Sequence, residues 1–396
     1  MSVERFTPAT SLIPHQPWDE KRKNSQPKYH IGASKGLSKT QKVILDCLAQ
    51  TGRVTLDVKV EPDTDLIDIL QNSGLDSSQM LIFKAALEQR ISLPAPIPVT
   101  TLINAQTLQV LENEILKITV SNTTQLLLPF ASEGERTPLF LFPPGGGELH
   151  CWLELVHHLP NRPIYGLRLR GLQKGETAFE SMAEAVSCFL EEICRVQPCG
   201  PYALLGMCFG GNIAYEVARE LEAKGEVVSF VGGIDNAPYI PEMSFAALRF
   251  FTIDLLASRR LITADEQKNL KKELSEAEPA TFPRLITRRF RTRLEAAGVT
   301  LERLEAWQRV FHGTVQIGKA YEPKGKIATY TSFWASPLSE WNISKKDWES
   351  RVRGWETLSA ESSFHFIGGN HYSALTRDHI NEFQKVLNRE LELHGI

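Results

Sequence analysis

One segment of the chain, YALLGMCFGGNIAYEVA at residues 202–218, combines a nucleophilic side chain with the local pattern that would expose it. An apolar run ends near Met207, and an amphipathic helical pattern begins directly after Cys208. Gly206 and Gly210 flank the cysteine, as a sharp and strained strand-to-helix turn requires, because larger side chains there would collide with neighbouring backbone. A thiol at a helix N-terminus should have a lowered pKa. The pattern predicts a cysteine nucleophile where serine is more usual, with a buried structural cysteine as the alternative.

A nucleophile on such a turn needs an acid and then a histidine from later loops, in that chain order. Asp235 ends the apolar segment VVSFVGGID, and His371 lies in the glycine-flanked segment FIGGNHYSALTRDHI before the last helical pattern. Each stands at the end of an expected strand, so we expect both at the same sheet edge as Cys208. Either residue alone is equally well explained as a solvated carboxylate or an exposed imidazole. Their order predicts a triad of Cys208, His371 and Asp235.

The glycine-rich segment FPPGGGELHCW, residues 142–152, predicts an oxyanion hole. In this arrangement a backbone N–H from the loop after an early strand pairs with the N–H of the residue after the nucleophile, which is Phe209. Gly145 is the first choice for the loop residue that donates its N–H, and Gly146 is the second. A single sequence does not determine which of the two glycines takes this position. The residues that follow, His150 and Cys151, either line the pocket or pack within a helix.

Short, nearly continuous apolar runs predict the strands that would position these residues, as expected when helices cover both faces of a parallel sheet. The runs are PLFLFPP, IYGLRLR, YALLGM and VVSFVGGID, and helical patterns such as SMAEAVSCFLEEICRVQ lie between them. This alternation predicts a doubly wound α/β domain over residues 138–396. Helical sequence from about residue 241 to 319 interrupts the alternation.

The N-terminal part of the chain has a different pattern. Residues 1–38 are rich in Pro, Lys, Ser and Gln, and we interpret them as a flexible leader with no assigned fold. Residues 39–122 show helical periodicity, with Ser38 as the expected N-cap, and predict a small all-α bundle. Residues 123–137 lack periodicity and are typical of a linker. In the segment SGLDSS, Ser77 is placed for covalent modification, although an ordinary helix N-cap explains it as well.

The amino-acid composition and net charge exclude several classes of protein. The 396 residues are 42% hydrophobic and 23% charged, which is typical of a soluble globular chain, and the net charge of −3 makes nucleic acid an unexpected partner. The sequence has no apolar core of signal-peptide length near its start and no stretch of membrane-spanning length, so it predicts a cytoplasmic protein without a membrane partner. Six cysteines without a CxxC pair argue against a disulfide framework and against a metal site.

The segment DTDLIDILQNSGLDSSQML, residues 63–81, resembles the acyl and peptidyl carrier domains. These are four-helix bundles in which the serine after an aspartate carries a phosphopantetheine arm. The resemblance implies a covalent 4′-phosphopantetheine cofactor on Ser77, attached by a phosphopantetheinyl transferase. The chain departs from the family at Ser78, where a bulky apolar residue is usual.

From Pro138 onward the chain resembles the thioesterase domains that terminate nonribosomal peptide and polyketide synthases, a branch of the α/β-hydrolase fold. The resemblance implies that residues 241–319 form a helical lid over the pocket. The length of this lid and the ending NHYSALTRDHINEFQKVL are similar to fungal synthetases with adenylation, carrier and thioesterase domains, which couple aryl-pyruvic acids into quinones or furanones. This chain shows no adenylation domain, so acyl groups would come from an upstream adenylation or synthase domain, in cis or in trans.

These resemblances imply a carrier and thioesterase didomain that moves an acyl group, in particular an aryl-keto acyl unit, from an arm on Ser77 to Cys208. A thioester at Cys208 keeps most of the activation of the incoming thioester, which favours condensation or cyclisation through a new C–C bond. Two alternatives stay open: a hydrolytic thioesterase that releases a free acid, and an inactive interaction module or a trap in which cysteine replaces serine. The arginines of the lid, Arg259 among them, either face solvent or pair with the carrier or with a substrate carboxylate.

Overall fold

A computed structural model of the protein describes residues 37–51, 61–63, 77–91, 97–120, 125–239, 250–259, 261–297, 299–338 and 341–396. Nearly all of the expected leader, the residues just before Ser77 and the first part of the expected lid lie outside these ranges. No helix within the described ranges combines the length and the apolar character that crossing a membrane requires.

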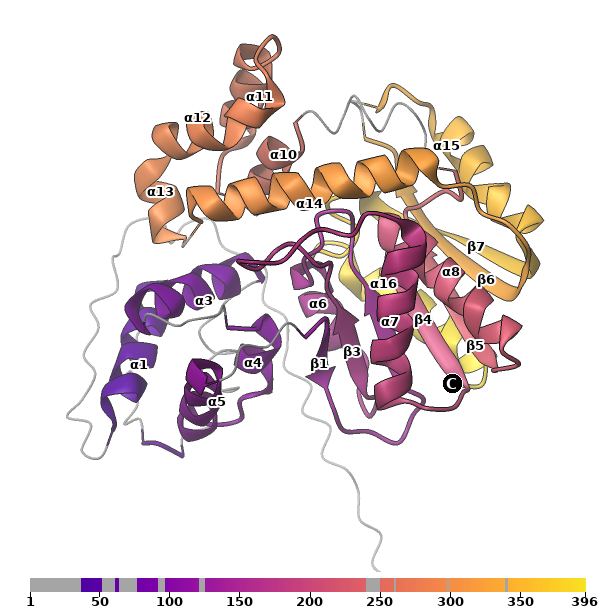
Figure 1. Ribbon diagram of the computed structural model, residues 1–396, viewed down its shortest axis with the longest axis horizontal. Coiled ribbons are helices and arrows are strands. Elements are labelled where there is room, and N and C mark those ends of the chain that lie inside the picture. Colours follow the sequence, from indigo (N-terminus) through magenta and orange to yellow (C-terminus); the bar gives the residue numbers. More distant parts are fainter. Residues whose placement is uncertain are drawn as a thin grey trace, which may run out of the picture.

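The centre of the molecule is a seven-stranded sheet with the strand order β1-β3-β2-β4-β5-β6-β7 (Figure 1). The strands are β1 (Leu127–Ala131), β2 (Leu139–Phe142), β3 (Ile164–Leu167), β4 (Tyr202–Met207), β5 (Val228–Ile234), β6 (Ile327–Ser336) and β7 (Ser359–Asn370). Neighbours from β3 to β7 pair in parallel, and β1 pairs antiparallel with β3. The carboxyl ends of β4, β5 and β7 therefore lie at one edge of the sheet.

Helices bury the central strands from both faces (Figure 1). One face carries α6 (Leu153–Val156) and α16 (Ile380–Leu393), and the other carries α7 (Met182–Val196) and α8 (Phe209–Ala223). The residues of β2 alternate between the faces: Leu139 and Leu141 pack with the first pair of helices, and Phe140 and Phe142 pack with the second. A strand that is covered on both sides produces this pattern, which explains why the strands appear in the sequence as continuous apolar runs.

A group of helices lies over the carboxyl edge of the sheet. The group comprises α10 (Phe251–Ser258), α11 (Ala264–Glu273), α12 (Phe282–Arg289), α13 (Arg291–Ala296) and α14 (Leu301–Ala320). The 20-residue helix α14 crosses the sheet domain in Figure 1. Its Leu304 and Trp307 belong to the apolar cluster of this helical group, whereas Val310 and Ile317 belong to the core around α7 and α8. Helix α14 therefore joins the lid to the sheet domain through buried apolar contacts.

The N-terminal helices are α1 (Lys39–Thr51), α3 (Ser77–Ile91), α4 (Val99–Asn104) and α5 (Leu108–Val120). They pack around a core that includes Ile44, Phe83 and Ile115, each fully buried. The expected N-cap is present, because Ser38 Oγ accepts a hydrogen bond from the Gln41 N–H at 3.0 Å. Helix α3 contacts α13 and the short 3₁₀ helix η1 (His150–Trp152), and α4 contacts β1.

The stretch expected to be a linker contains a strand. Leu127–Ala131 form β1 at the edge of the sheet, and Pro129 interrupts its apolar pattern. A proline lacks the N–H of a ladder hydrogen bond and is tolerated on an edge strand, which has one unpaired side. Because β1 is antiparallel, the sheet is mixed rather than wholly parallel. After the glycines, the chain forms the short 3₁₀ helix η1 and the four-residue helix α6.

The remaining described elements complete the C-terminal region. They are η2 (Pro279–Thr281), α15 (Lys345–Val352) and η4 (Arg353–Thr357). Helix α15 follows β6 and η4 leads directly into β7, so this stretch connects the last two parallel strands across one face of the sheet.

Candidate active site

Cys208 lies on a strained turn between β4 and α8. Its backbone adopts φ 55° and ψ −126°, a conformation that side-chain-bearing residues rarely adopt, and its N–H donates to the Ile234 carbonyl at 2.8 Å. A Cβ on Gly206 would lie 2.1 Å from the Gly210 carbonyl oxygen, and a Cβ on Gly210 would lie 2.5 Å from the Phe142 carbonyl oxygen. The backbone passes too close at both positions for any other residue. The glycines flanking the cysteine therefore have the steric role that the sequence predicted.

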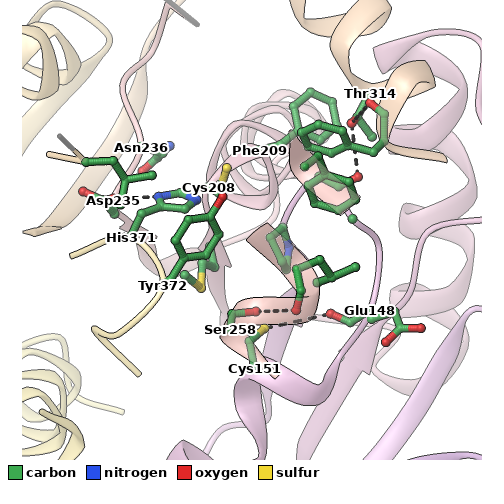
Figure 2. A pocket seen from close by; sticks show the side chains of 18 of the residues that line it. Glu148, Cys151, Cys208, Phe209, Asp235, Asn236, Ser258, Thr314, His371 and Tyr372 are labelled. Atoms are coloured by element: carbon green, nitrogen blue, oxygen red, sulfur yellow. Dashed lines mark hydrogen bonds and ion pairs between the residues drawn. The ribbon is translucent and has the colours of Figure 1, made fainter. Parts of the chain in front are cut away.

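His371 and Asp235 form a direct pair at the same edge of the sheet. His371 Nδ1 lies 2.7 Å from Asp235 Oδ2, and Figure 2 shows the imidazole between the carboxylate and Cys208. Asp235 directly follows β5, and His371 directly follows β7. The carboxylate is almost completely buried and the imidazole is 12% exposed. The structure thus brings together the three residues that the sequence singled out by chain order.

The second carboxylate oxygen of Asp235 also accepts hydrogen bonds. Asp235 Oδ1 accepts hydrogen bonds from the Ala335 N–H at 3.1 Å and from Trp348 Nε1 at 3.0 Å. These donors leave Oδ2 for the histidine and fix the plane of the carboxylate. A buried carboxylate that is held in this way orients an imidazole and stabilises its protonated form.

The electrostatics favour a thiolate and imidazolium pair. Burial alone would raise the pKa of the Cys208 thiol, but the charge and hydrogen bond of His371 and the Phe209 N–H outweigh it, so that the pKa lies below its ordinary value. Burial alone would lower the pKa of His371, but Cys208 and Asp235 raise it to about 10. The two shifts have the signs expected of a proton that has moved from sulfur to nitrogen.

We predict that Cys208 is alkylated by iodoacetamide at a pH below that of an ordinary thiol. His371→Gln should move the midpoint of its rate profile to higher pH, because burial then acts on the thiol without a neighbouring cation. Peptide mass spectrometry across pH 5 to 10 follows Cys208, with the exposed Cys199 in the same sample as the internal reference. An unchanged Cys208 midpoint in the variant would show that His371 does not set the thiol pKa.

The glycine loop after β2 lies on the wall of the same cavity. Gly145 and Gly146 both line it, and the Gly147 N–H donates to the Pro144 carbonyl at 2.7 Å with Gly147 at φ 81°. The hydroxyl oxygen of Thr314 on α14 lies 3.1 Å from the Gly145 carbonyl oxygen and 2.7 Å from the Phe311 carbonyl oxygen, and its one proton is shared between these two acceptors. The polar contact with Gly145 joins the loop to the lid. Gly145, Gly146 and Phe209, the first residue of α8, thus all line the cavity that holds Cys208.

The cavity has a volume of about 220 Å³. Figure 2 shows many of the side chains that line it. Its walls come from the glycine loop, the turn at Cys208, the lid and the loops after β5, β6 and β7. The apolar side chains on these walls are Met207, Phe209, Ala237, Phe251, Leu255, Phe311, Val315, Leu338, Trp341 and Trp348. Phe251 and Phe311 stack with their ring centroids 3.6 Å apart. A cavity of this kind suits an acyl group with an aromatic or other apolar body.

The structure also places the neighbouring residues that the sequence left open. His150 and Cys151 both line the cavity. Ser77 is the first residue of α3, and the turn that precedes it lies outside the described residues.

Sequence reasoning missed several residues that hold the site in place. Trp348 reaches Asp235 from α15, and the Asn370 carboxamide accepts from the Tyr372 and Ser373 N–H groups, which shapes the loop that carries His371. Thr314 reaches the glycine loop from α14. A tryptophan or threonine within a helical pattern gives no local sign of such contacts, because their partners lie far along the chain.

Comparison with known proteins places the chain in a family. The family model of the thioesterase domain matches residues 137–391. The chain belongs to the thioesterase-domain family. This confirms the resemblance noted from Pro138 onward, and the relatives identify the fungal branch that the narrower similarity indicated.

Aspulvinone E synthetase melA of Aspergillus terreus is 28% identical over 361 residues, which cover 90% of this chain and 38% of that protein. Atromentin synthetase invA1 of Paxillus involutus is 30% identical over 357 residues, which cover 84% of this chain and 35% of that protein. This thioesterase-domain chain spans little more than a third of the length of these curated relatives.

A solved structure of a four-domain nonribosomal peptide synthetase, holo-AB3403 bound to AMP and glycine, is also similar in fold. The match covers 92% of this chain and 27% of that one, at 20% identity and a TM-score of 0.57. The thioesterase family model matches residues 137–391. A structural match that covers 92% of the chain therefore includes residues before this domain.

Proposed function

We propose that this thioesterase-domain protein is an acyl transferase in which Cys208 is the nucleophile, His371 the base and Asp235 the residue that orients it. The observation that carries the proposal is the geometry at the sheet edge: a strained Cys208 with a lowered pKa beside an imidazole held at 2.7 Å by a buried carboxylate. Such an arrangement performs nucleophilic acyl transfer.

The first step is acylation of the thiol. The Cys208 thiolate attacks the carbonyl carbon of an acyl thioester, and the oxyanion that forms accepts hydrogen bonds from the Phe209 N–H and from Gly145 or Gly146. As the intermediate collapses, the bond from the carbonyl carbon to the sulfur of the donor thioester breaks, and the new bond to the Cys208 sulfur remains. His371 gives its proton to the departing thiolate, so the step leaves an acylated Cys208, a free thiol and a neutral imidazole.

The second step is attack by carbon. His371 accepts a proton from the enol form of a second acyl unit, whose carbon attacks the Cys208 thioester, forms a C–C bond and expels the Cys208 thiolate. Two features favour this outcome over hydrolysis: a thioester stays more reactive toward carbon than an oxoester, and the cavity walls are mostly apolar, which disfavours water. The names of the two relatives, an aspulvinone and an atromentin synthetase, support aryl-keto acyl units as the substrate class.

The N-terminal helices form the carrier part of this proposal, and Ser77 is its attachment site for 4′-phosphopantetheine. A phosphodiester on Ser77 would sit at the N-terminus of the 15-residue helix α3, where backbone N–H groups and the helix dipole favour negative charge, so the position fits the group. When bound, the arm would present acyl groups as thioesters. Tethering would raise their local concentration to roughly millimolar. The fold match to the four-domain synthetase, which covers 92% of the chain, supports this assignment.

The expected partners follow from this scheme. A phosphopantetheinyl transferase would modify Ser77, and an adenylation or synthase domain would supply the acyl groups. The curated relatives are about three times as long as the part of them that this chain matches, which leaves room for such domains in those proteins.

Ser77→Ala should abolish the gain of phosphopantetheine mass after treatment with a promiscuous phosphopantetheinyl transferase and coenzyme A. The adjacent Ser78→Ala is the matched control and should retain the gain, because it leaves the proposed attachment oxygen in place. Intact-protein mass spectrometry reads both variants. Modification that persists in Ser77→Ala and disappears in Ser78→Ala would move the attachment site by one residue.

Product analysis tests the proposed reaction itself. The chain is loaded by the transferase from an aryl-pyruvyl coenzyme A, and the released small molecules are identified by mass spectrometry. A coupled product that contains two acyl units is the expected result. Free monomeric acid as the sole product would assign the site to hydrolysis instead.

A further inference from the structure

A group of charged and polar side chains lies at one side of the active-site cavity, and three of its members, Glu148, His150 and Arg259, line the cavity. We call Glu148, His150, Arg259, Arg303 and Trp307 the Glu148 cluster. Glu148 directly follows the glycine loop, and its carboxylate is 10% exposed. It accepts hydrogen bonds from Arg259 Nη2 at 2.5 Å, Arg303 Nη2 at 2.7 Å and Trp307 Nε1 at 2.5 Å.

The Glu148 cluster has an excess of positive charge. Burial alone would raise the pKa of Glu148, but Arg259 and Arg303 hold it well below its ordinary value, so the carboxylate is ionised. Burial and Arg259 lower the pKa of His150, which is therefore neutral at pH 7. Two guanidinium groups thus face one carboxylate. The nearby Lys84 and Glu88 on α3 are paired at 2.6 Å and add no net charge.

Within the Glu148 cluster, Arg259 has a hydrogen-bond donor that no acceptor pairs with in the described part of the chain. Its side chain is 6% exposed, its guanidinium carbon lies 4.0 Å above the Trp307 ring, and its Nη2 faces Glu148 and His150. Within the part of the chain that the structure describes, the buried Nε has no hydrogen-bond partner. A buried donor on a cation is costly to leave unpaired, so it indicates an acceptor that arrives with a ligand.

The position of Arg259 indicates which ligand supplies that acceptor. Arg259, His150 and Ser258 line the cavity that holds Cys208, and most of its remaining walls are apolar. Arg259 and Cys208 line one and the same cavity, so an acyl group bound beside Cys208 shares this space with the guanidinium. The acceptor is therefore an oxygen of the acyl group that the cavity holds.

We propose that Arg259 binds the 2-oxo oxygen of an acyl unit, in its keto or its enolate form. This inference rests on the proposed acyl transfer to Cys208. A guanidinium that carries uncompensated charge stabilises an enolate oxygen more strongly than a neutral carbonyl, so Arg259 both selects 2-oxo acyl groups and favours the form that attacks through carbon. Plain aryl-alkanoyl groups lack this oxygen and leave the Arg259 donor unpaired.

The test compares two acyl donors that differ in this oxygen alone: the N-acetylcysteamine thioesters of phenylpyruvate and of 3-phenylpropionate. The rate at which each acylates Cys208 is followed in single turnover by intact-protein mass spectrometry. The wild-type chain should prefer the phenylpyruvyl donor. Arg259→Gln should reduce the ratio of the two rates about 10- to 100-fold, which corresponds to the loss of one hydrogen bond to a charged group. Arg259→Lys should restore part of the preference.

Arg303→Gln is the matched control. Arg303 binds the other oxygen of Glu148 but is not among the residues that line the cavity, so its loss should change both rates together and leave their ratio intact. An equal ratio in the wild-type chain, or equal ratios in wild type and Arg259→Gln, would overturn the inference. Failure of both donors to acylate Cys208 would instead contradict the proposed function, so the two failures are distinguishable.

Discussion

Replacement of Cys208 by alanine is expected to reduce turnover of an acyl thioester by on the order of 10⁶-fold in kcat. Alanine removes the only side-chain atom proposed to form a covalent bond with the acyl group, whereas the Phe209 N–H, the glycine loop and the cavity remain. The residual rate should equal that of His371→Ala, because nucleophile and base act as a unit and their losses are not additive. Release of acyl product from the loaded chain is the measurement.

Cys208→Ser is the matched variant for this experiment, since it keeps a nucleophilic atom on the same turn. It should still acylate, but the resulting oxoester should couple less with a carbon nucleophile and give proportionally more free acid. Unchanged turnover in Cys208→Ala would contradict the account and support the alternative of an inactive hydrolase fold. Full coupling activity in Cys208→Ser would remove the chemical reason for a thiol at this position.

Asp235→Asn should lower kcat by about 10⁴-fold without disturbing the fold. The amide is nearly the same size as the carboxylate and can still accept from Trp348 and Ala335, but it carries no charge to stabilise the imidazolium. Because Asp235 raises the pKa of His371, the variant should have a lower histidine pKa and a smaller fraction of thiolate at neutral pH. The rate of product release and the pH profile of Cys208 alkylation report these two effects separately.

Asp347→Asn provides the control for this prediction. Asp347 is an exposed carboxylate in the first turn of α15, the helix that also carries Trp348, and it bonds only to Ser344 within the described contacts. Its loss should leave kcat within about twofold of wild type. A comparable loss of rate in both variants would indicate that removal of charge near α15, and not orientation of His371, controls the reaction.

The sequence predicted that Cys208, Asp235 and His371 lie close together because each of these residues directly follows a strand. Met207, Ile234 and Asn370 end β4, β5 and β7, and parallel strands bring their carboxyl ends to one edge of the sheet. The steric need for glycine at 206 and 210 also follows from sequence alone, since a nucleophile on a sharp turn requires close backbone approach.

Other parts of the structure depend on contacts that no local pattern reveals. The edge strand β1 could not be predicted, because Pro129 interrupts it and the surrounding sequence has no alternation of apolar and polar residues. Trp348 and Asp235 are 113 positions apart, and Arg303 and Glu148 are 155 apart, so neither pair is visible as a motif. A lid arginine looks like an ordinary solvated charge in the sequence. Only the fold shows that Arg259 is buried and lines the cavity that also holds Cys208.

The central claim is that an acyl group passes through Cys208 on its way to product. The most direct test loads the chain with an aryl-pyruvyl group, quenches the reaction in acid at short times and maps the acyl mass by peptide mass spectrometry. We predict an acyl thioester on the peptide that contains Cys208, appearing before the coupled product and absent from Cys208→Ala. Acyl mass that is confined to Ser77 while product forms at the wild-type rate would contradict the account.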